Sequence, residues 1–298
     1  MTISPVTGID ELRLDRVHGG SWLARIAVEA LLQEAAAGAD SADELRERLV
    51  KTARDLVVSR PDSGSVATAV ARLLAVAHGS WVLSVNELRR LVLDEARALL
   101  GARDRAARSI AIQLAPRLAD AVVVTHSASA TVREAVTHTP PRRLICTACE
   151  PLGEGREFAD ELREHGLNVT LVGDADAASA LDEATLVLVG ADTIYLDGTL
   201  ANRRGTHSLA EAAHGRGIPV VVACEVIKLA PFDPPDAPSD PDLSDLTPPG
   251  LIAEISTEEG AVRPDEIAAL VERTPLLREG YALLRGDRSA APTQRSFS

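Results

Sequence analysis

The fold of this chain is decided by residues 186–223, which read LVLVGADTIYLDGTLANRRGTHSLAEAAHGRGIPVVVA. An apolar run leads into Asp192, a turn carries Asn202 and Arg203 to the start of a helical stretch, and a second apolar run follows at residues 220–223. Two short buried strands joined through a helix are typical of a parallel sheet, whose ligands bind beyond the carboxyl ends of the strands. We therefore expect Asp192 and the Asn202-Arg203 pair to share one sheet edge, where a helix start attracts a small phosphorylated molecule.

The sequence on both sides of this stretch repeats the pattern of short apolar runs separated by helical segments. The runs are rich in Val and Leu and cover residues 121–125, 144–148, 169–172, 186–189, 220–223 and 251–255. Nearly continuous apolar runs of this length predict parallel strands that helices cover on both faces. Residues 231–249, PFDPPDAPSDPDLSDLTPP, are rich in proline and aspartate and predict a surface loop.

The first part of the chain has a helical rhythm instead. Between residues 10 and 119 the apolar residues recur every three or four positions, which predicts a bundle of amphipathic helices. Two pairs, Ser41 with Glu44 and Ser84 with Glu87, have the spacing of a capping box and mark helix starts. We therefore predict an α/β protein with a helical N-terminal domain at 1–119, a Rossmann-like doubly wound parallel sheet domain at 120–298, and a ligand crevice at their junction.

Composition limits the possible functions. The formal net charge is -13 and lysine occurs only at positions 51 and 228, so the chain lacks the clustered basic residues that a nucleic acid requires. No apolar run approaches the roughly 20 residues of a membrane-spanning helix. Three cysteines, an odd number, without a secretory leader favour a reducing cytoplasm. The expectation is a cytoplasmic protein that contacts neither a membrane nor a nucleic acid.

No metal or organic cofactor is predicted. Cys146 and Cys149 form a single C-x-x-C pair, and without a second pair of cysteines or histidines they do not complete a zinc site. Two small residues at a strand end are the simpler interpretation. Gly153 and Gly155 predict a tight turn between strand and helix, but they fall short of the three-glycine dinucleotide fingerprint. A nicotinamide cofactor is therefore not indicated.

Two motifs in the helical part are candidates for anion binding. Gly19, Gly20 and Ser21 open a helix, and free amides at a helix start attract a phosphate that the glycines allow to come close. An ordinary helix start after a glycine turn is the alternative. Arg60 precedes another helix and has a forked side chain that suits a phosphate, although a surface arginine explains the same pattern.

Three positions in the sheet part are candidates for ligand contact. Ser127 follows the first predicted strand, where a phosphate or hydroxyl commonly binds; N-capping serines beside a half-buried His126 are the alternative. No G-x-S-x-G elbow surrounds this serine, which argues against a hydrolase. Asp192 suits proton transfer if partial burial raises its pKa, and otherwise accepts hydrogen bonds. Lys228 is expected to contact the ligand or to form an ion pair.

Taken in order, the motifs resemble the superfamily that unites the regulatory subunits of translation initiation factor 2B with two sugar-phosphate isomerases. Those enzymes are methylthioribose-1-phosphate isomerase and ribose-1,5-bisphosphate isomerase. The likeness is carried by HGGSWLARIA, RPDSGSVATAV, VVVTHSASATV, EPLGEGREFADEL, LVGADTIYLDGTLANRRGTHSLA, IPVVVACEVIK and TPPGLIAEISTEEGAVRPDEI. The resemblance implies a pocket for a sugar phosphate or nucleotide, and a homodimer or higher homo-oligomer.

The resemblance also implies roles for particular residues. It places Asp192 at the catalytic aspartate of the isomerases. Together with the motifs above, it gives as candidate ligand-binding residues Gly19, Gly20, Ser21, Arg60, Ser127, Glu154, Gly155, Asn202, Arg203 and Lys228. The chain departs from the isomerases in three places. Ser127 replaces the catalytic cysteine, His18 replaces the first phosphate-loop arginine, and the family's Glu-Ser-Arg-Pro stretch has become Ala148-Cys149-Glu150-Pro151.

Three functions follow from these observations. The favoured one is a regulatory protein that binds a sugar phosphate or nucleotide, because the missing thiol and arginine weaken both proton transfer and phosphate affinity. The alternative is an aldose-ketose isomerase of a ribose-1-phosphate-type substrate, with Asp192 as the acid-base group and Cys149 in place of the missing cysteine. The third is a structural oligomer with a vestigial pocket.

Overall fold

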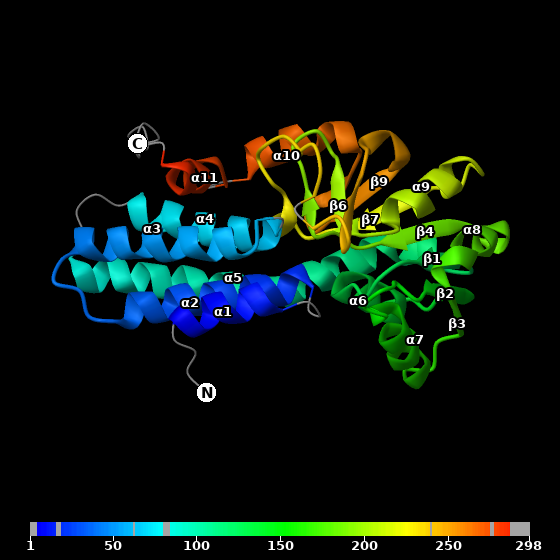
Figure 1. Ribbon diagram of the computed structural model, residues 1–298, viewed down its shortest axis with the longest axis horizontal. Coiled ribbons are helices and arrows are strands. Elements are labelled where there is room, and N and C mark those ends of the chain that lie inside the picture. The colour runs from blue at the N-terminus through cyan, green and yellow to red at the C-terminus, as the bar shows by residue number, and fades with distance from the viewer. Residues whose placement is uncertain are drawn as a thin grey trace. The chain divides into compact units, whose positions relative to one another are not determined.

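The computed structural model describes residues 5–15, 19–61, 63–79, 84–238, 240–274 and 277–286. The chain forms two compact units, which Figure 1 shows as a group of helices and a sheet with its covering helices. The helical unit comprises Met1–Ala102 and Leu270–Ser298, and the sheet unit comprises Arg103–Ala269. This division differs from the expected one in two ways: the first boundary falls within α5 (Val85–Leu118), between residues 102 and 103 and not at 119, and the last part of the chain returns to the helical unit.

The helical unit confirms the predicted helices. Its elements are α1 (Pro5–Leu14), α2 (Gly20–Ala36), α3 (Ala42–Ser59), α4 (Gly64–His78), the first part of α5 (Val85–Leu118) and α11 (Leu277–Arg285). Ser41 Oγ accepts a hydrogen bond from Glu44 N at 3.1 Å and so caps α3. At the start of α5, Ser84 Oγ accepts from Glu87 N at 3.4 Å while Glu87 Oε2 accepts from Ser84 N at 2.9 Å. The capping spacing in the sequence therefore marks real helix starts.

The last helix belongs to the helical unit because it packs closely on α4. A Cβ atom added to Gly280 of α11 would lie 1.9 Å from the carbonyl oxygen of Ala71, so only glycine permits this approach. Beside it, Tyr281 and Thr68 share a hydrogen bond of 3.0 Å between their hydroxyl oxygens. Arg54 of α3 adds bonds to the backbone carbonyls near the end of α11. The boundary between the two units at residues 269–270 falls within α10 (Ile267–Arg273).

The sheet unit contains a seven-stranded sheet with the order β10-β9-β7-β4-β1-β2-β3. Its strands are β1 (Val122–Thr125), β2 (Arg143–Thr147), β3 (Val169–Val172), β4 (Leu186–Val189), β7 (Val220–Ala223), β9 (Glu254–Thr257) and β10 (Gly260–Val262). Neighbouring strands are parallel except β9 and β10. The predicted mostly parallel sheet is therefore confirmed. Its last predicted strand begins later than expected, because Pro249–Leu251 form a short 3-10 turn.

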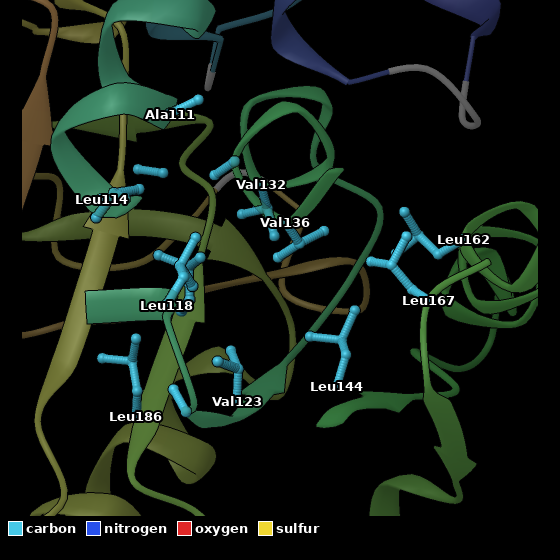
Figure 2. Close-up of a cluster of buried hydrophobic side chains, with 14 of the residues drawn as sticks. Ala111, Leu114, Leu118, Val123, Val132, Val136, Leu144, Leu162, Leu167 and Leu186 are labelled. Atoms are coloured by element: carbon cyan, nitrogen blue, oxygen red, sulfur yellow. The ribbon is translucent and has the colours of Figure 1, made fainter. Parts of the chain in front are cut away.

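Helices cover the sheet as the alternating pattern predicts. The end of α5 packs with α6 (Ala130–His138) and α7 (Glu154–Glu164) over a buried core. Figure 2 shows this core, with side chains from the helices meeting those from the strands at Leu114, Leu118, Val123, Val132, Val136, Leu144, Leu162 and Leu186. Burying one leucine or valine side chain stabilises the folded state by about 1.5–3 kcal/mol relative to leaving it exposed. Further along, α8 (Ala177–Ala180) precedes β4, and α9 (Thr206–His214) packs against β4 and β7.

A small antiparallel sheet corrects the expectation that residues 231–249 form only a loop. It consists of β5 (Thr193–Ile194), β6 (Leu200–Arg203) and β8 (Ser244–Thr247), in the order β5-β6-β8. The register places Asn202 opposite Asp245. The pairing with β6 gives this proline-rich segment a short strand that its composition does not predict. No helix within the described residues combines the length and apolar character needed to cross a membrane.

Candidate functional site

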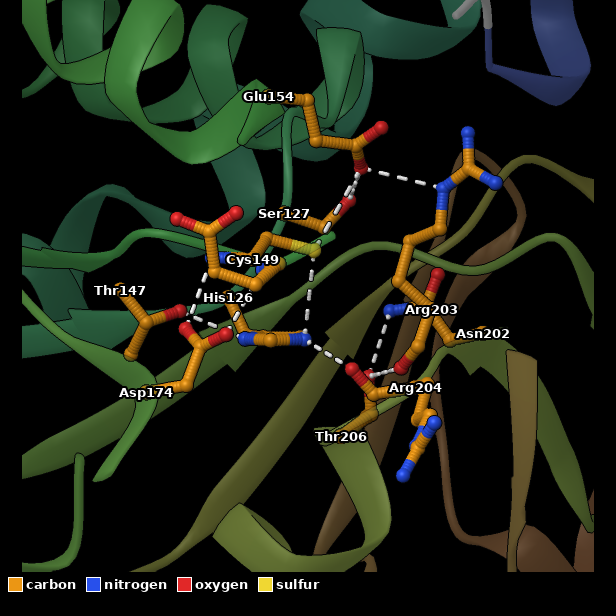
Figure 3. A network of polar contacts seen from close by, with 11 residues as sticks. His126, Ser127, Thr147, Cys149, Glu154, Asp174, Asn202, Arg203, Arg204 and Thr206 are labelled. Atoms are coloured by element: carbon orange, nitrogen blue, oxygen red, sulfur yellow. Dashed lines mark hydrogen bonds and ion pairs between the residues drawn. The ribbon is translucent and has the colours of Figure 1, made fainter. Parts of the chain in front are cut away.

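A polar cluster forms where the first strands of the parallel sheet end. Ser127 follows β1, Cys149 follows β2, Glu154 begins α7, and Arg203 ends β6. Figure 3 shows these side chains pointing toward one another above a buried histidine, His126. We call Ser127, Cys149, Glu154 and Arg203 the rim cluster. The structure therefore brings together four of the residues that the sequence predicts for the site.

Glu154 is the centre of the rim cluster. Its Oε1 atom accepts hydrogen bonds from Ser127 Oγ at 2.7 Å and from Arg203 Nε at 3.1 Å, and the Cys149 thiol donates to the same oxygen at 3.8 Å. Its other oxygen, Oε2, is buried and has no hydrogen-bond partner among the described residues. A buried carboxylate oxygen without a donor is costly, so this atom is suited to accept a hydrogen bond from a ligand.

Both loops that carry the thiol and the hydroxyl adopt an uncommon backbone conformation. Ser127 has φ of 71° and Cys149 has φ of 60°, a left-handed region that non-glycine residues rarely occupy. Asp174, which follows β3, stabilises the second loop by accepting from Cys149 N at 2.8 Å and from Glu150 N at 2.7 Å. Such conformations persist where surrounding contacts over-determine them, and they cluster at functional sites.

Gly155 has a packing role in this structure. A Cβ atom on Gly155 would lie 1.9 Å from the carbonyl oxygen of Thr147 at the end of β2, so the absence of a side chain lets α7 begin directly against the strand. This close approach sets the position of Glu154. The structure therefore shows a packing role for Gly155, while ligand binding by this residue stays a prediction.

Burial and charge keep the Cys149 thiol protonated. Burial raises the pKa of Cys149, the negative charge of Glu154 raises it further, and Arg203 opposes both to a smaller extent. Arg203 behaves in the opposite way: burial alone would lower its pKa, but the charges of Asp192 and Glu154 outweigh burial and raise it. At neutral pH the rim cluster therefore combines a neutral thiol with an arginine that stays charged.

His126 joins three loops beneath the rim cluster and is fully buried rather than half buried. Its Nε2 atom lies 2.8 Å from the backbone carbonyl oxygen of Arg204, to which it must donate, so in the neutral ring Nδ1 accepts from Thr147 Oγ1 at 2.6 Å. Cys149 Sγ lies 3.5 Å from the same Nε2. Because both ring nitrogens already have partners, His126 supports the loops rather than serving as a free base.

Asp192 lies directly after β4, as the sequence predicts. Its backbone N-H donates to Ala201 O at 3.0 Å, and its side chain is half buried. Within the described residues its carboxylate accepts no hydrogen bond. It is close enough to Arg203 and Lys228 for its charge to raise the pKa of both. This position leaves the carboxylate available for a ligand.

Lys228 forms an ion pair in this structure, one of the two roles considered for it. Its Nζ atom lies 2.9 Å from Glu225 Oε2, and both side chains are buried. Thr131 donates to the other oxygen of Glu225 at 2.7 Å. Burial alone would raise the pKa of Glu225, but the charge of Lys228 and the hydrogen bonds from Lys228, Thr131 and the backbone together lower it. Burial likewise opposes the raised pKa of Lys228. Glu225 is a partner that sequence spacing did not identify.

The helix start after Arg203 is already occupied by a carboxylate of the chain itself. Asp245 Oδ2 accepts from Gly205 N at 2.7 Å and from His207 N at 3.2 Å. Asn202 is buried, and its Nδ2 donates to Thr206 Oγ1 at 3.2 Å. The expected anion cradle at this helix is therefore corrected: its first amides bind Asp245, which lies in the segment expected to be a loop.

The predicted anion-binding residues of the helical unit are described by their contacts within that unit. Gly19 is the exposed N-cap of α2, while Gly20 and Ser21 are buried in its first turn. Arg60 Nε donates to the carbonyl oxygen of Leu12 at 2.6 Å, and its guanidinium also donates to the carbonyl oxygen of Asp15. Arg60 therefore ties the end of α1 to the end of α3. His18 lies outside the described residues.

The C-x-x-C pair has no metal-binding geometry in the part of the chain that the structure describes. No group of three or more His, Cys, Asp or Glu residues there is arranged to hold a metal ion. Cys146, Cys149 and Cys224 are free and buried. Burial raises the pKa of Cys146 to about 12, so this thiol is protonated at neutral pH.

The helical unit, the parallel sheet and polar loops at the strand ends define an α/β protein of the kind that binds small molecules at a sheet edge. Residues 16–238 match the model of the Initiation factor 2 subunit family, and the chain belongs to this family. Its relatives include enzymes and proteins named as translation factors.

The chain is 30% identical to ribose 1,5-bisphosphate isomerase of Haloterrigena turkmenica, over 89% of this chain and 92% of that protein. It is 32% identical to a putative translation initiation factor eIF-2B subunit 2-like protein of Pyrococcus horikoshii, over 74% of this chain and 78% of that protein. The crystal structure of the P. horikoshii translation initiation factor eIF-2B superimposes with a TM-score of 0.75 at 28% identity, covering 87% of this chain and 97% of that one. The resemblance in the sequence motifs is thus confirmed at the level of the family.

Proposed function

We propose that this protein is a sugar-phosphate isomerase that converts an aldose 1-phosphate of the ribose type into the corresponding ketose phosphate. The observation that carries the proposal is the meeting of Ser127, Cys149 and Arg203 on one oxygen of Glu154, whose other oxygen is buried without a partner among the described residues. An isomerase needs proton-transferring groups and a fixed positive charge close together. The similarity to an enzyme named ribose 1,5-bisphosphate isomerase, over most of both chains, supports the substrate class.

The proposed chemistry is a redox-neutral rearrangement within one molecule. The bond between C1 and the ring oxygen breaks, the ring oxygen gains a proton, the 2-hydroxyl loses its proton, and the hydrogen on C2 moves to C1. Cys149 is the proposed acid, because its thiol carries a proton at neutral pH and donates to Glu154 Oε1 at 3.8 Å within the rim cluster. Asp192 is the proposed acid-base group for the 2-hydroxyl. A well-placed acid or base contributes roughly 10²–10⁴-fold to such a reaction.

The rim cluster also offers groups that bind a sugar phosphate. Arg203 uses Nε for Glu154, and in Figure 3 its terminal nitrogens extend away from that bond, so we assign them to a phosphate. Glu154 Oε2 is proposed to accept a hydrogen bond from a sugar hydroxyl. Gly19, Gly20 and Ser21 remain proposed anion-binding residues of the helical unit, supported by their place at the start of α2.

The test is to monitor conversion of the substrate by phosphorus and carbon NMR. Ribose 1,5-bisphosphate incubated with the protein is expected to give the ketose bisphosphate, and Asp192→Asn is expected to lower kcat at least roughly 100-fold. Asp197→Asn is the matched control, because Asp197 caps its own turn through Thr199. Unchanged substrate at stoichiometric protein concentration would reject the isomerase.

A regulatory binding protein is the second candidate. The family resemblance places Ser127 where the isomerases carry their cysteine. Its hydroxyl donates to Glu154, which favours binding over proton transfer at that position. Under this reading a sugar phosphate or nucleoside monophosphate raises the melting temperature without being converted, and Arg203→Ala removes the shift. Conversion of the substrate would reject a purely regulatory role.

We also propose that the protein acts in the cytoplasm as a homodimer or higher homo-oligomer. Three free, buried cysteines are consistent with a reducing compartment, and the proposed oligomer follows the resemblance to the family. Size-exclusion chromatography with light scattering is expected to give at least twice the 31.5 kDa mass of one chain. A mass equal to one chain at micromolar concentration would contradict the oligomer.

A further inference from the structure

Asp245 connects the small antiparallel sheet to the loop that carries Arg203. The carboxylate lies in β8, opposite Asn202 of β6. Its Oδ2 atom accepts from Gly205 N at 2.7 Å and its Oδ1 atom lies 3.3 Å from His207 N. Amides at the start of a helix have no partner within the helix, so a carboxylate placed there stabilises both the helix and the loop before it.

The loop that Asp245 holds contacts the rim cluster at two points. Arg203 donates to Glu154 Oε1 at 3.1 Å, and the carbonyl oxygen of Arg204 accepts from His126 Nε2 at 2.8 Å. Both contacts depend on the path of residues 203–205. Movement of this segment would therefore disturb Glu154 and His126 together.

Gly205 makes the path of this segment specific. It has φ of 106°, and a Cβ atom at this position would lie 2.9 Å from His126 Cε1. The backbone thus packs directly on the ring that lies beside Cys149, whose Sγ is 3.5 Å from His126 Nε2. A bond that fixes the Gly205 amide also fixes the surface against which His126 rests.

We propose that Asp245 is a positioning residue for the rim cluster: by binding the Gly205 and His207 amides it holds residues 203–205 so that Arg203 stays on Glu154 and His126 stays locked beside Cys149. The catalytic consequence rests on the proposed function. The positioning itself does not, because the accessibility of the Cys149 thiol reports on it without any turnover.

The test is the rate of alkylation of each cysteine by iodoacetamide in the native protein, measured by peptide mass spectrometry. Asp245→Ala is expected to label Cys149 roughly tenfold faster, since a lost capping carboxylate favours local opening. Cys146 and Cys224 are buried elsewhere and are expected to keep their slow rates. Asp245→Asn is expected to stay close to the unmodified protein, because asparagine caps a helix nearly as well as aspartate.

Asp242→Ala is the matched control in the same segment, since Asp242 is exposed and forms a long ion pair, with 3.8 Å between its Oδ1 atom and Arg204 Nη1. An unchanged Cys149 rate in Asp245→Ala would overturn the proposal. Equal acceleration of all three cysteines would also overturn it, because it would report global unfolding. A rate in Asp245→Asn as high as in Asp245→Ala would reject the hydrogen-bond role. If the NMR assay shows no conversion, the isomerase proposal is rejected. The alkylation rates still test the positioning role of Asp245, because they require no turnover.

Discussion

The two units use their candidate arginines in different ways. In the sheet unit, Arg203 binds a carboxylate through Nε, and its charge is supported by Glu154 and Asp192. In the helical unit, Arg60 donates to the backbone carbonyls of Leu12 and Asp15. Both arginines precede a helix, and sequence alone gives them the same interpretation. The difference teaches that the partner, supplied by a distant segment, decides whether an arginine belongs to a polar site or ties two helices together.

The largest effect on stability is expected from breaking the buried ion pair between Lys228 and Glu225. Lys228→Met leaves the Glu225 carboxylate buried without its cation and is expected to lower the free energy of unfolding by about 3–5 kcal/mol, measured by urea denaturation. The control is Lys51→Met, which removes the other lysine from an exposed pair and is expected to cause no measurable change. Equal losses in both variants would contradict the burial argument.

A second large effect is expected at the backbone that packs on His126. Gly205→Ala combines a left-handed φ with a clash against the ring and is expected to cost about 2–4 kcal/mol in the free energy of unfolding. Gly217→Ala separates the two causes, because Gly217 also has a positive φ but nothing lies within 4 Å of its added Cβ. Gly217→Ala is expected to lower the free energy of unfolding by about 1 kcal/mol. A similar cost at both glycines would show that contact with His126 adds nothing.

A smaller effect is expected from the arginine of the helical unit. Arg60→Ala removes its bonds to the carbonyl oxygens of Leu12 and Asp15 and is expected to lower the free energy of unfolding by about 1–3 kcal/mol. Arg97→Ala, which removes an exposed arginine, is expected to stay within about 0.5 kcal/mol of the unmodified protein. An unchanged free energy of unfolding in Arg60→Ala would contradict the stabilising role assigned to Arg60.

The smallest effect is a pH dependence from the Cys149 thiol. Its folded pKa is raised, so the unfolded chain binds fewer protons above the ordinary thiol pKa of about 8.5, and stability falls as pH rises beyond that value. One such thiol contributes a slope of about 1.4 kcal/mol per pH unit. Urea denaturation between about pH 8.5 and 10 is therefore expected to give a shallower slope for Cys149→Ala. Identical slopes would mean that the folded thiol ionises normally.

Much of the fold is predictable from the sequence because the inner strands β1, β4 and β7 are buried on both faces. Runs such as residues 122–125 and 220–223 are buried at every position, so their composition alone predicts parallel strands. The strand at Ser244–Thr247 is different, since its first three residues are only half buried and its sequence lacks an apolar run; it pairs with β6. Likewise, the place of α11 depends on close contact between Gly280 and Ala71, which periodicity does not reveal.

The sequence predicts which residues lie at the candidate site, but not which hydrogen bonds they form with one another. The rule that ligands bind at strand ends identifies Ser127, Cys149 and Asp192, and the family resemblance adds Glu154. Neither the rule nor the resemblance shows that Glu154 Oε1 accepts from three donors, since these donors come from separate segments. Nor does either show that Asp245 fills the helix start that was expected to hold a phosphate. Short-range patterns predict where polar groups lie, whereas their pairing depends on tertiary contacts.

The central claim is that Cys149 supplies the thiol that Ser127 lacks, and exchanging the two residues tests it most directly. The rate of conversion of ribose 1,5-bisphosphate is measured for the unmodified protein, for Cys149→Ser and for the double variant Cys149→Ser with Ser127→Cys. The account predicts a loss of kcat of at least roughly 100-fold in Cys149→Ser and partial recovery in the double variant. An unmodified kcat in Cys149→Ser would contradict it.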